Sequence, residues 1–259
     1  MTESVGVAGV AASLVLVAIA VGLSLRQRLG VERTIVWACT RALVQLLAVG
    51  SALTLVLDED APVALALLWV AAMVVIAAVT ISRRAPEVPN LLPVGFVAIG
   101  TATVVAHLVL YGLQIFPFEP IAIVPLAGMV VGNSLAATVS AARRTVAELA
   151  GNHMEVEARL ALGQPWPEAS RPYVRAAIRT ALTAQIESTK TVGLIALPGA
   201  MTGLILAGVD PVDAVLVQLV VMYLILGAVA TTTAIVGMGV TRRLFTSDHR
   251  LLPVARAEE

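Results

Sequence analysis

Long apolar runs separated by short polar segments fill almost the whole chain. A helix needs about 20 apolar residues to cross the roughly 30 Å hydrocarbon core of a membrane. Seven runs are long enough, at about 4–25, 34–57, 61–82, 91–116, 121–142, 191–209 and 214–241. Each run is continuous rather than alternating, which is typical of membrane helices and not of barrel strands. The pattern predicts an all-α integral membrane protein, a polytopic bundle of about seven transmembrane helices forming one domain over residues 1–259.

The one large polar segment, 143–190, is predicted to form two helices outside the membrane. Residues 143–162 are good helix formers, and the sequence Gly-Gln-Pro-Trp-Pro that follows must end the first helix. A second helix is predicted from near Glu168 through Ser188. It carries a basic stripe that repeats every four residues and therefore lies on one face, formed by Arg171, Arg175 and Arg179.

Two interpretations of this basic helix stay open. The pattern alone favours an amphipathic helix lying on anionic lipid. The break at Gly163–Pro167 favours a protruding helix–turn–helix that docks a cytoplasmic partner, because lipid binding needs no such protrusion.

Composition agrees with a membrane protein and excludes several other classes. Apolar residues make up 59% of the 259 residues and charged residues 13%, and the mean hydropathy is +0.93. Lys and Arg number 17 and so do Asp and Glu, so no basic surplus points to a nucleic-acid partner. The single cysteine, Cys39, excludes a disulfide framework.

The sides on which charges fall predict the orientation. Every basic residue outside the predicted spans lies between the first and second, the third and fourth, or the fifth and sixth span, or after the seventh. The loops on the opposite side of the membrane hold acids and no basic residue. The acidic side carries Glu3, Asp58, Glu59, Asp60, Glu119, Asp210 and Asp213. Basic loops remain cytoplasmic. The N-terminus is therefore predicted outside, and the C-terminus and segment 143–190 in the cytoplasm.

Polar and helix-breaking residues inside the predicted spans are candidates for a translocation pathway. Arg41 is the most costly of them, and it either snorkels to the inner surface or faces protein together with Gln45. Pro198-Gly199 is expected to kink or unwind its span, which is tolerated only beside protein or water. The candidate pathway residues are Arg41, Gln45, Met129, Asn133, Pro198, Met201, Thr202 and Gln218. Close helix packing at the glycines and core filling by the methionines are the alternatives, and the metal ligands stay unknown.

The chain lacks the motifs that would make it an enzyme or an ATPase. Its only lysine, Lys190, does not follow a phosphate-binding glycine loop, and no hydrolase arrangement is present. No acid lies in any predicted span, so no proton relay is expected. If the chain moves a solute uphill, the energy comes from another subunit.

Three segments resemble a known family. Glu157-Ala158-Arg159, followed by Gly163, is similar to the start of the cytoplasmic EAA loop of ABC permeases, with Arg159 in place of the second alanine. Segments 124–133 and 190–211 are similar to the family of uncharacterised ABC-type permeases that includes the bacterial iron export permease FetB and plant aluminium-tolerance permeases. The resemblance covers most of the chain.

This resemblance implies a multi-pass permease of the bacterial plasma (inner) membrane that works as a homodimer with a separate ABC ATPase. It implies no cofactor in this chain, with ATP and Mg bound by the ATPase, and export of iron or another metal ion. A nucleotide-sugar or other small-solute permease is an alternative, and a self-sufficient channel, a secondary carrier and a membrane scaffold stay open. The residues expected to couple to the ATPase are Glu155, Glu157, Arg159, Gly163, Arg171 and Arg175. A continuous helical lever over 168–209 is expected to move the fifth and sixth spans.

Overall fold

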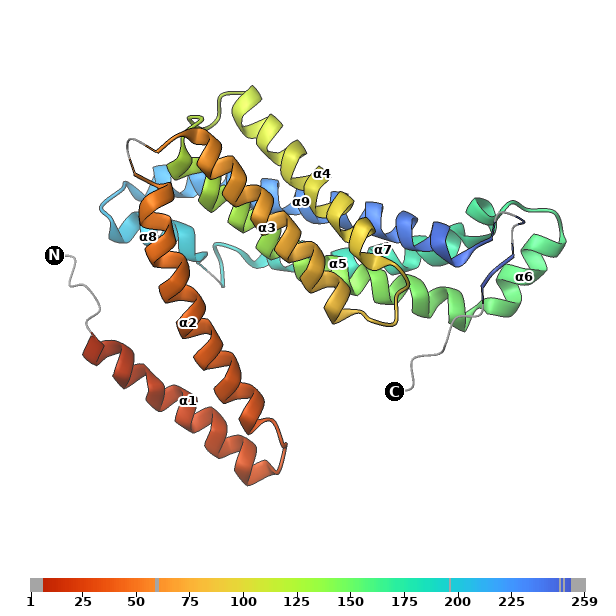
Figure 1. Cartoon of the computed structure of the whole chain (residues 1–259), viewed down its shortest axis with the longest axis horizontal. Coiled ribbons are helices and arrows are strands. Elements are labelled where there is room, and N and C mark those ends of the chain that lie inside the picture. Colours follow the sequence, from red (N-terminus) through yellow and green to blue (C-terminus); the bar gives the residue numbers. More distant parts are fainter. Residues whose placement is uncertain (1–6, 59–60, 196, 247, 249, 253–259) are drawn as a thin grey trace. The chain divides into compact units, whose positions relative to one another are not determined.

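The computed structural model describes residues 7–58, 61–195, 197–246, 248 and 250–252. Within these ranges the secondary structure is helical, apart from isolated bridge residues such as the pair Phe245 and Leu251. The chain divides into two compact units, residues 1–61 and 62–259, which are described separately (Figure 1). The all-α prediction is confirmed over the described residues.

The first unit is a helical hairpin of α1 (Val7–Gln27) and α2 (Glu32–Val56). Its turn contains Arg28 and Gly30, both with positive φ. The hydroxyl of buried Ser24 donates a hydrogen bond of 2.7 Å to a carboxylate oxygen of Glu32, joining the end of one helix to the start of the next. Most other side chains of this hairpin are exposed within the unit, as expected for helices whose apolar surface meets lipid or protein.

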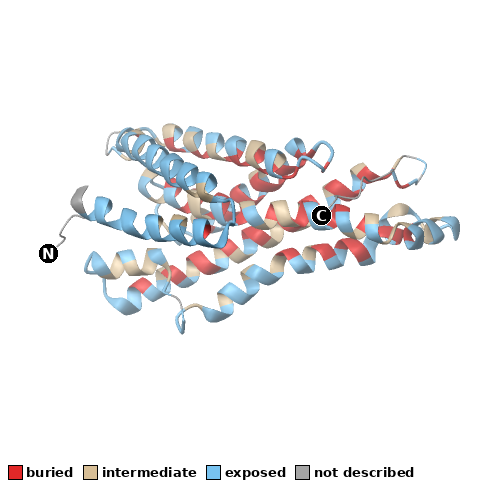
Figure 2. Cartoon of the chain, turned by 90° about the horizontal axis from the view of Figure 1, so that it is seen from below, coloured by how far each residue is buried: buried red, intermediate tan, exposed pale blue. Residues whose placement is uncertain are grey.

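The second unit is a bundle built around two long helices, α5 (Pro120–Gly151) and α9 (Pro211–Leu244), which pack on each other. The hairpin of α3 (Val63–Arg84) and α4 (Leu91–Gly112) covers one side, and α7 (Trp166–Thr191) covers another. Two short helices, α6 (His153–Ala161) and α8 (Gly199–Leu206), complete the unit. Figure 2 shows the buried residues along the facing sides of these helices. The largest of them include Ile81, Leu91, Ile99, Ile123, Leu149, Val236 and Val240.

Helices α5 and α9 are longer than the membrane is thick. Their 32 and 34 residues span about 48 and 51 Å at 1.5 Å per residue, against about 30 Å of hydrocarbon. Both extend beyond the α3–α4 hairpin, and α6 and the start of α7 pack there (Figure 1). The predicted separate helix over 143–162 is therefore wrong. Its first half is the end of α5, and α6 forms only after a break at Asn152.

Six described helices, rather than about seven, are long and apolar enough to cross a membrane, namely α1, α2, α3, α4, α5 and α9. The predicted span 191–209 contains only the eight-residue α8. Helix α7 ends because Val192 adopts an extended conformation and Gly193 has φ of 86°. Pro198 is also extended, so the interruption expected at Pro198–Gly199 is present. The continuous lever expected over 168–209 does not exist, because its backbone is interrupted between α7 and α8.

Two glycines of α9 allow neighbouring helices to approach closely. A Cβ atom on Gly237 would lie 2.9 Å from the side chain of Ile178 on α7, and one on Gly239 would lie 2.7 Å from Cγ1 of Val94 on α4. Val94 is branched at Cβ and cannot easily turn away. Gly227, on the same helix, has nothing within 4 Å of its Cβ position.

We predict that Gly239→Ala lowers stability and Gly227→Ala does not. Alanine at 239 overpacks the α4–α9 contact, at a cost of about 1–3 kcal/mol, and this exceeds the helix-propensity gain of about 1 kcal/mol that both variants share. The measurement is the thermal unfolding midpoint in detergent. Val94→Ala combined with Gly239→Ala should relieve the overlap, and equal midpoints for the two single variants would contradict the contact.

Candidate functional site

Helix α6 joins α5 to α7 at one end of the second unit and is fixed to α7 by side-chain contacts. The hydroxyl of Tyr173 donates a hydrogen bond of 2.7 Å to Oε2 of Glu155. The guanidinium carbon of Arg159 lies 5.9 Å from the centre of the Tyr173 ring, within the range of a cation–π contact. Val156 is fully buried between these residues and the core. Two predicted coupling residues, Glu155 and Arg159, therefore meet on one tyrosine of α7.

The environment of Tyr173 keeps its hydroxyl a donor. Burial raises the pKa of the Tyr173 phenol, and the hydrogen bond to the Glu155 carboxylate raises this pKa further. A phenol already neutral at physiological pH thus keeps its proton. Sequence reasoning missed Tyr173, because a tyrosine on an amphipathic helix gives no sign of a partner 18 residues earlier.

Gly163 forms the turn between α6 and α7. Its φ of 87° lies in the left-handed region, which costs other residues about 1–2 kcal/mol. The turn is closed by hydrogen bonds from the Gly163 amide to the Leu160 carbonyl, at 2.9 Å, and from the Gln164 amide to the Arg159 carbonyl, at 3.1 Å. Pro165 is extended and leads into α7. The structure thus places the predicted breaker at the residues expected and gives Gly163 a conformational role.

The outward side of α6 combines charge with exposed apolar side chains. The Glu157 carboxylate is exposed and lies 3.4 Å from Nε2 of His153, one turn earlier on the same helix. Met154 and Leu162 are 84% and 83% exposed. The sequence analysis did not single out Met154 and Leu162. Their apolar character within the polar segment 143–190 was a signal that could have identified them.

The basic stripe of α7 lies beside a cavity between α7 and α9, so α7 is packed against another helix. Arg171 and Arg175 are exposed and, with Trp166, Val174 and Met238 among other residues, line a cavity of about 380 Å³ between α7 and α9. The apolar stripe next to the arginines packs against protein. Val174 is buried, and Ile178 contacts α9 at Gly237. This packing is unlike that of an amphipathic helix whose apolar face enters lipid.

Of the predicted pathway residues, Met201 and Gln218 are brought together. They line a cavity of about 230 Å³ that also includes Gly193 and Met222. Gln218 is 5% exposed, and its Oε1 has no hydrogen-bond partner among the described residues. A buried amide oxygen without a partner is costly. This cavity lies beside the interrupted backbone between α7 and α8.

The remaining predicted pathway residues do not line this cavity, although Pro198 and Thr202 adjoin the lining residues Leu197 and Met201. The amide of Asn133 donates to the carbonyl of Met129 on its own helix, α5, at 2.7 Å. Thr202 donates to the carbonyl of Pro198 at 3.1 Å, at the start of α8. Arg41 and Gln45 are exposed on α2 in the first unit.

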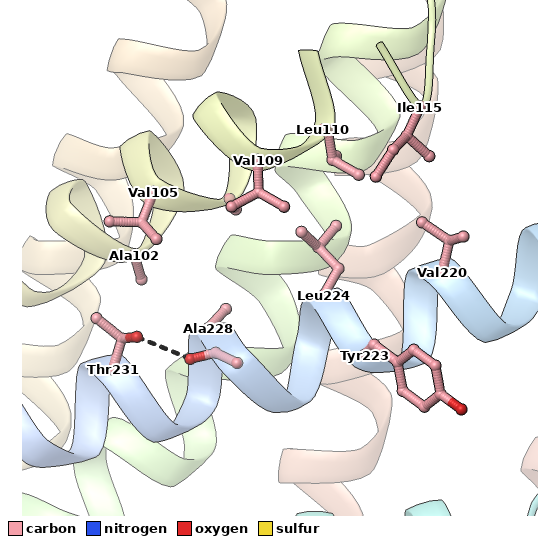
Figure 3. Close-up of a pocket in the computed structure, with 12 residues that line it drawn as sticks. Ala102, Val105, Val109, Leu110, Ile115, Val220, Tyr223, Leu224, Ala228 and Thr231 are labelled. Atoms are coloured by element: carbon pink, nitrogen blue, oxygen red, sulfur yellow. Dashed lines mark hydrogen bonds between the residues drawn. The ribbon is translucent and has the colours of Figure 1, made fainter. Parts of the chain in front are cut away.

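A further cavity of about 320 Å³, between α4 and α9, contains none of the predicted site residues (Figure 3). Its lining is mostly aliphatic, with Val105, Leu224 and Ala228 pointing into it. The Thr231 hydroxyl is satisfied by the Gly227 carbonyl at 2.8 Å. An apolar hollow of this kind suits a hydrocarbon chain better than an ion. Across the described part of the chain, no group of three or more His, Cys, Asp or Glu side chains gathers as a metal site.

Comparison with known proteins identifies the relatives of this chain. Residues 7–245 match the sequence profile of the Uncharacterised protein family (UPF0014). The chain is 39% identical to the UPF0014 membrane protein STAR2 of Oryza sativa subsp. japonica, over 86% of this chain and 78% of the relative. It is 33% identical to the Probable iron export permease protein FetB of Escherichia coli (strain K12), over 93% of each. It is 36% identical to the Protein ALUMINUM SENSITIVE 3 of Arabidopsis thaliana, over 87% of this chain and 82% of the relative. No solved structure matches.

We predict that Tyr173→Phe loosens α6 from α7. Loss of the hydrogen bond to Glu155 should raise amide hydrogen exchange in 153–161 about fivefold, which corresponds to about 1 kcal/mol. Hydrogen exchange read by mass spectrometry is the measurement. Glu155→Gln added to Tyr173→Phe should change exchange little further, because both remove one interaction. Glu157→Gln is the control, since the ion pair of Glu157 is with His153 on the same helix. An unchanged rate in Tyr173→Phe would exclude the bracing role.

Proposed function

Because this chain belongs to the uncharacterised protein family UPF0014, we propose that it is the permease subunit of an ABC transporter, driven by a separate ATPase subunit. The observation that carries this proposal is α6, a short helix at the tip of the bundle that is braced on α7 and displays Met154 and Glu157, followed by the exposed Leu162. The exposed apolar pair supplies area for a protein contact, and the carboxylate supplies specificity.

The contacts of α6 give a route by which ATPase motion reaches the membrane. Helix α6 follows α5 after the single residue Asn152 and is joined to α7 through Tyr173. Helices α5 and α7 both pack on α9. A displacement of α6 would therefore move two helices of the bundle. ATP and Mg would be bound by the ATPase alone. Arg159 supports this bracing through the Tyr173 ring, Gly163 forms the turn into α7, and Arg171 and Arg175 are exposed on α7.

We propose an orientation with the α6 end in the cytoplasm of a bacterial plasma membrane and the N-terminus outside. Basic residues gather at this end of the bundle. Arg143 of α5 pairs with Glu87 at 2.8 Å and donates to the carbonyl of Arg84, which places the α3–α4 turn beside α5. Arg242 and Arg243 lie in the last turn of α9. Basic groups gathered at one level are expected on the cytoplasmic side.

The proposed cargo is iron or another metal ion, exported by two copies of this chain with two ATPase subunits. FetB, a relative over nearly its full length, is named as a probable iron export permease. The cavity beside the break holds the thioethers of Met201 and Met222 and the free carbonyl oxygen of Gln218. Thioethers prefer soft metal ions, and an amide oxygen can add a hard ligand.

We predict that a co-expressed ABC ATPase from the same genome co-purifies with this chain and that Glu157→Lys abolishes the stimulation of its ATP hydrolysis. The reversed charge opposes the contact, and Met154→Asp should weaken binding by placing a charge in an apolar interface. Asp213→Lys, a charge reversal in the first turn of α9 at the opposite end of the helix, is the control and should retain stimulation. Full stimulation in Glu157→Lys would exclude docking through α6.

The cargo is tested by reconstitution of both subunits in liposomes. Ferrous iron, manganese, aluminium and a nucleotide sugar are screened for stimulated hydrolysis and ATP-dependent flux. Stimulation by a metal ion supports metal export. Stimulation by the nucleotide sugar alone would contradict metal export and support a nucleotide-sugar permease. Flux through the chain without ATPase would identify a self-sufficient carrier instead.

A further inference from the structure

Helix α7 runs antiparallel to α9, and side-chain contacts give the register between them. The Trp166 ring at the start of α7 stacks on Phe245, with 5.6 Å between ring centroids. Three turns along, Ile178 meets α9 at Gly237, where a Cβ would lie 2.9 Å from its side chain. The cavity beside Met201, formed by the residues after α7 and the first half of α9, continues the same register. Each residue further along α7 thus lies level with a residue earlier on α9.

This register places Glu187 at membrane depth. It lies level with α9 between Leu224 and Ala228. The apolar part of α9 between Asp213 and Arg242 is about 42 Å long at 1.5 Å per residue, longer than the hydrocarbon layer of about 30 Å. Wherever a 30 Å layer is placed within that length, it includes the middle of α9. It therefore includes Glu187, provided that α9 crosses the membrane as proposed.

The side of α7 at this depth is exposed and mostly polar, with Ile186, which is 40% exposed, at its edge. The side chains of Glu187 and Lys190 are 58% and 63% exposed and form an ion pair of 2.8 Å. Thr183 and Ser188 are exposed as well. A charged side chain in the middle of the lipid costs about 2.5–3.5 kcal/mol, so this face cannot meet hydrocarbon. Charged residues at such depth face protein or water and mark solute pathways.

We propose that this face lines a water-filled passage through the membrane, with Glu187, Ser188 and Lys190 in contact with the solute. The face is named the α7 wall and consists of the exposed residues Arg179, Thr180, Thr183, Ala184, Glu187, Ser188, Lys190 and Thr191. The inference rests on the proposed permease function and adds a wall that contains none of the pathway residues expected from the sequence. Water in the passage removes the cost of the charges, and the hydroxyls replace part of a solute's hydration shell.

The charges of the α7 wall select the class of solute. Arg179 and Lys190 are positive, and the single carboxylate, Glu187, is already paired with Lys190. A bare cation at this wall meets a net positive charge, and repulsion between like charges is strong where water is scarce. The passage therefore favours a solute that carries negative charge, which for an exported metal means an anionic complex of the ion.

Cysteine accessibility tests the wall without ATP hydrolysis or transport. The full chain is reconstituted in lipid nanodiscs with its only cysteine removed by Cys39→Ser, and Ser188→Cys or Ala184→Cys is added. Each variant reacts with a cationic methanethiosulfonate, the ethyltrimethylammonium reagent, and with an anionic one, the ethylsulfonate reagent. Intact-mass spectrometry gives the rates.

Leu108→Cys is the matched control. Leu108 is 67% exposed on α4, and the contact between Val94 and Gly239 places it level with the same part of α9 as Glu187. Val104, one turn earlier on α4, is exposed and apolar as well, so we expect Leu108 to face lipid. A thiol in apolar surroundings stays protonated, and the thiolate is the reactive form. We expect both α7 positions to react at least about tenfold faster than Leu108→Cys.

The two reagents also test the charge of the wall. The ratio of anionic to cationic rates at Ser188→Cys should exceed the ratio for 2-mercaptoethanol in solution, and Lys190→Gln should lower it severalfold. Rates at both α7 positions as slow as at Leu108→Cys would overturn the wall, and a preference for the cationic reagent would overturn the solute class. The labelling experiment and the ATPase co-purification are independent. Either labelling result leaves the permease function standing, and failed co-purification leaves the labelling result standing.

Discussion

Hydrocarbon solvates neither a charge nor an unpaired backbone amide, and the second unit is arranged around this constraint. Its long helices α5 and α9 satisfy their backbones internally, and their contact carries the core that includes Val131 and Val236. The remaining elements pack on these two helices. The backbone is irregular between α7 and α8, where the cavity with Gln218 and Met201 lies beside it. Irregular backbone at membrane depth is stable only next to protein or water.

Packing on α9 also explains how a polar helix can lie beside an apolar one. Helix α7 uses Val174, Ala177 and Ala181 to cover α5 and α9, and its arginines are exposed. Gly237 allows Ile178 to approach closely enough for this packing. The apolar side of α7 therefore packs against the bundle, while its polar side is free to face the proposed water-filled passage.

Local patterns predicted most of the helices and failed where tertiary packing decides. The run 61–82 became α3 and the run 214–241 became most of α9, because continuous apolar sequence of that length has one stable form in lipid. The prediction of a spanning helix over 191–209 was wrong, because hydropathy does not report backbone conformation and Val192 and Pro198 are extended. The depth of α7 depends on contacts such as Trp166–Phe245, between residues 79 positions apart, and no local pattern carries that information.

The candidate site shows the same division. The breaker at Gly163 was predictable, since its conformation follows from residue type. The hydrogen bond between Glu155 and Tyr173 was not, because it joins two helices across a turn. The pair of Glu157 with His153, four positions earlier on the same helix, is by contrast a local contact.

These contacts give the proposed transporter a lever shorter than the one expected over 168–209. Helix α7 is continuous from Trp166 to Thr191, about 39 Å at 1.5 Å per residue, although Pro172 inside it removes one backbone hydrogen-bond donor. One end is joined to α6 through Tyr173, and the α7 wall lies toward the other. Gly193, with its positive φ, follows that end and can absorb a change in direction. On the proposed function, motion imposed at α6 would shift the α7 wall past α9, and the interrupted backbone after α7 would act as a hinge rather than as part of the lever.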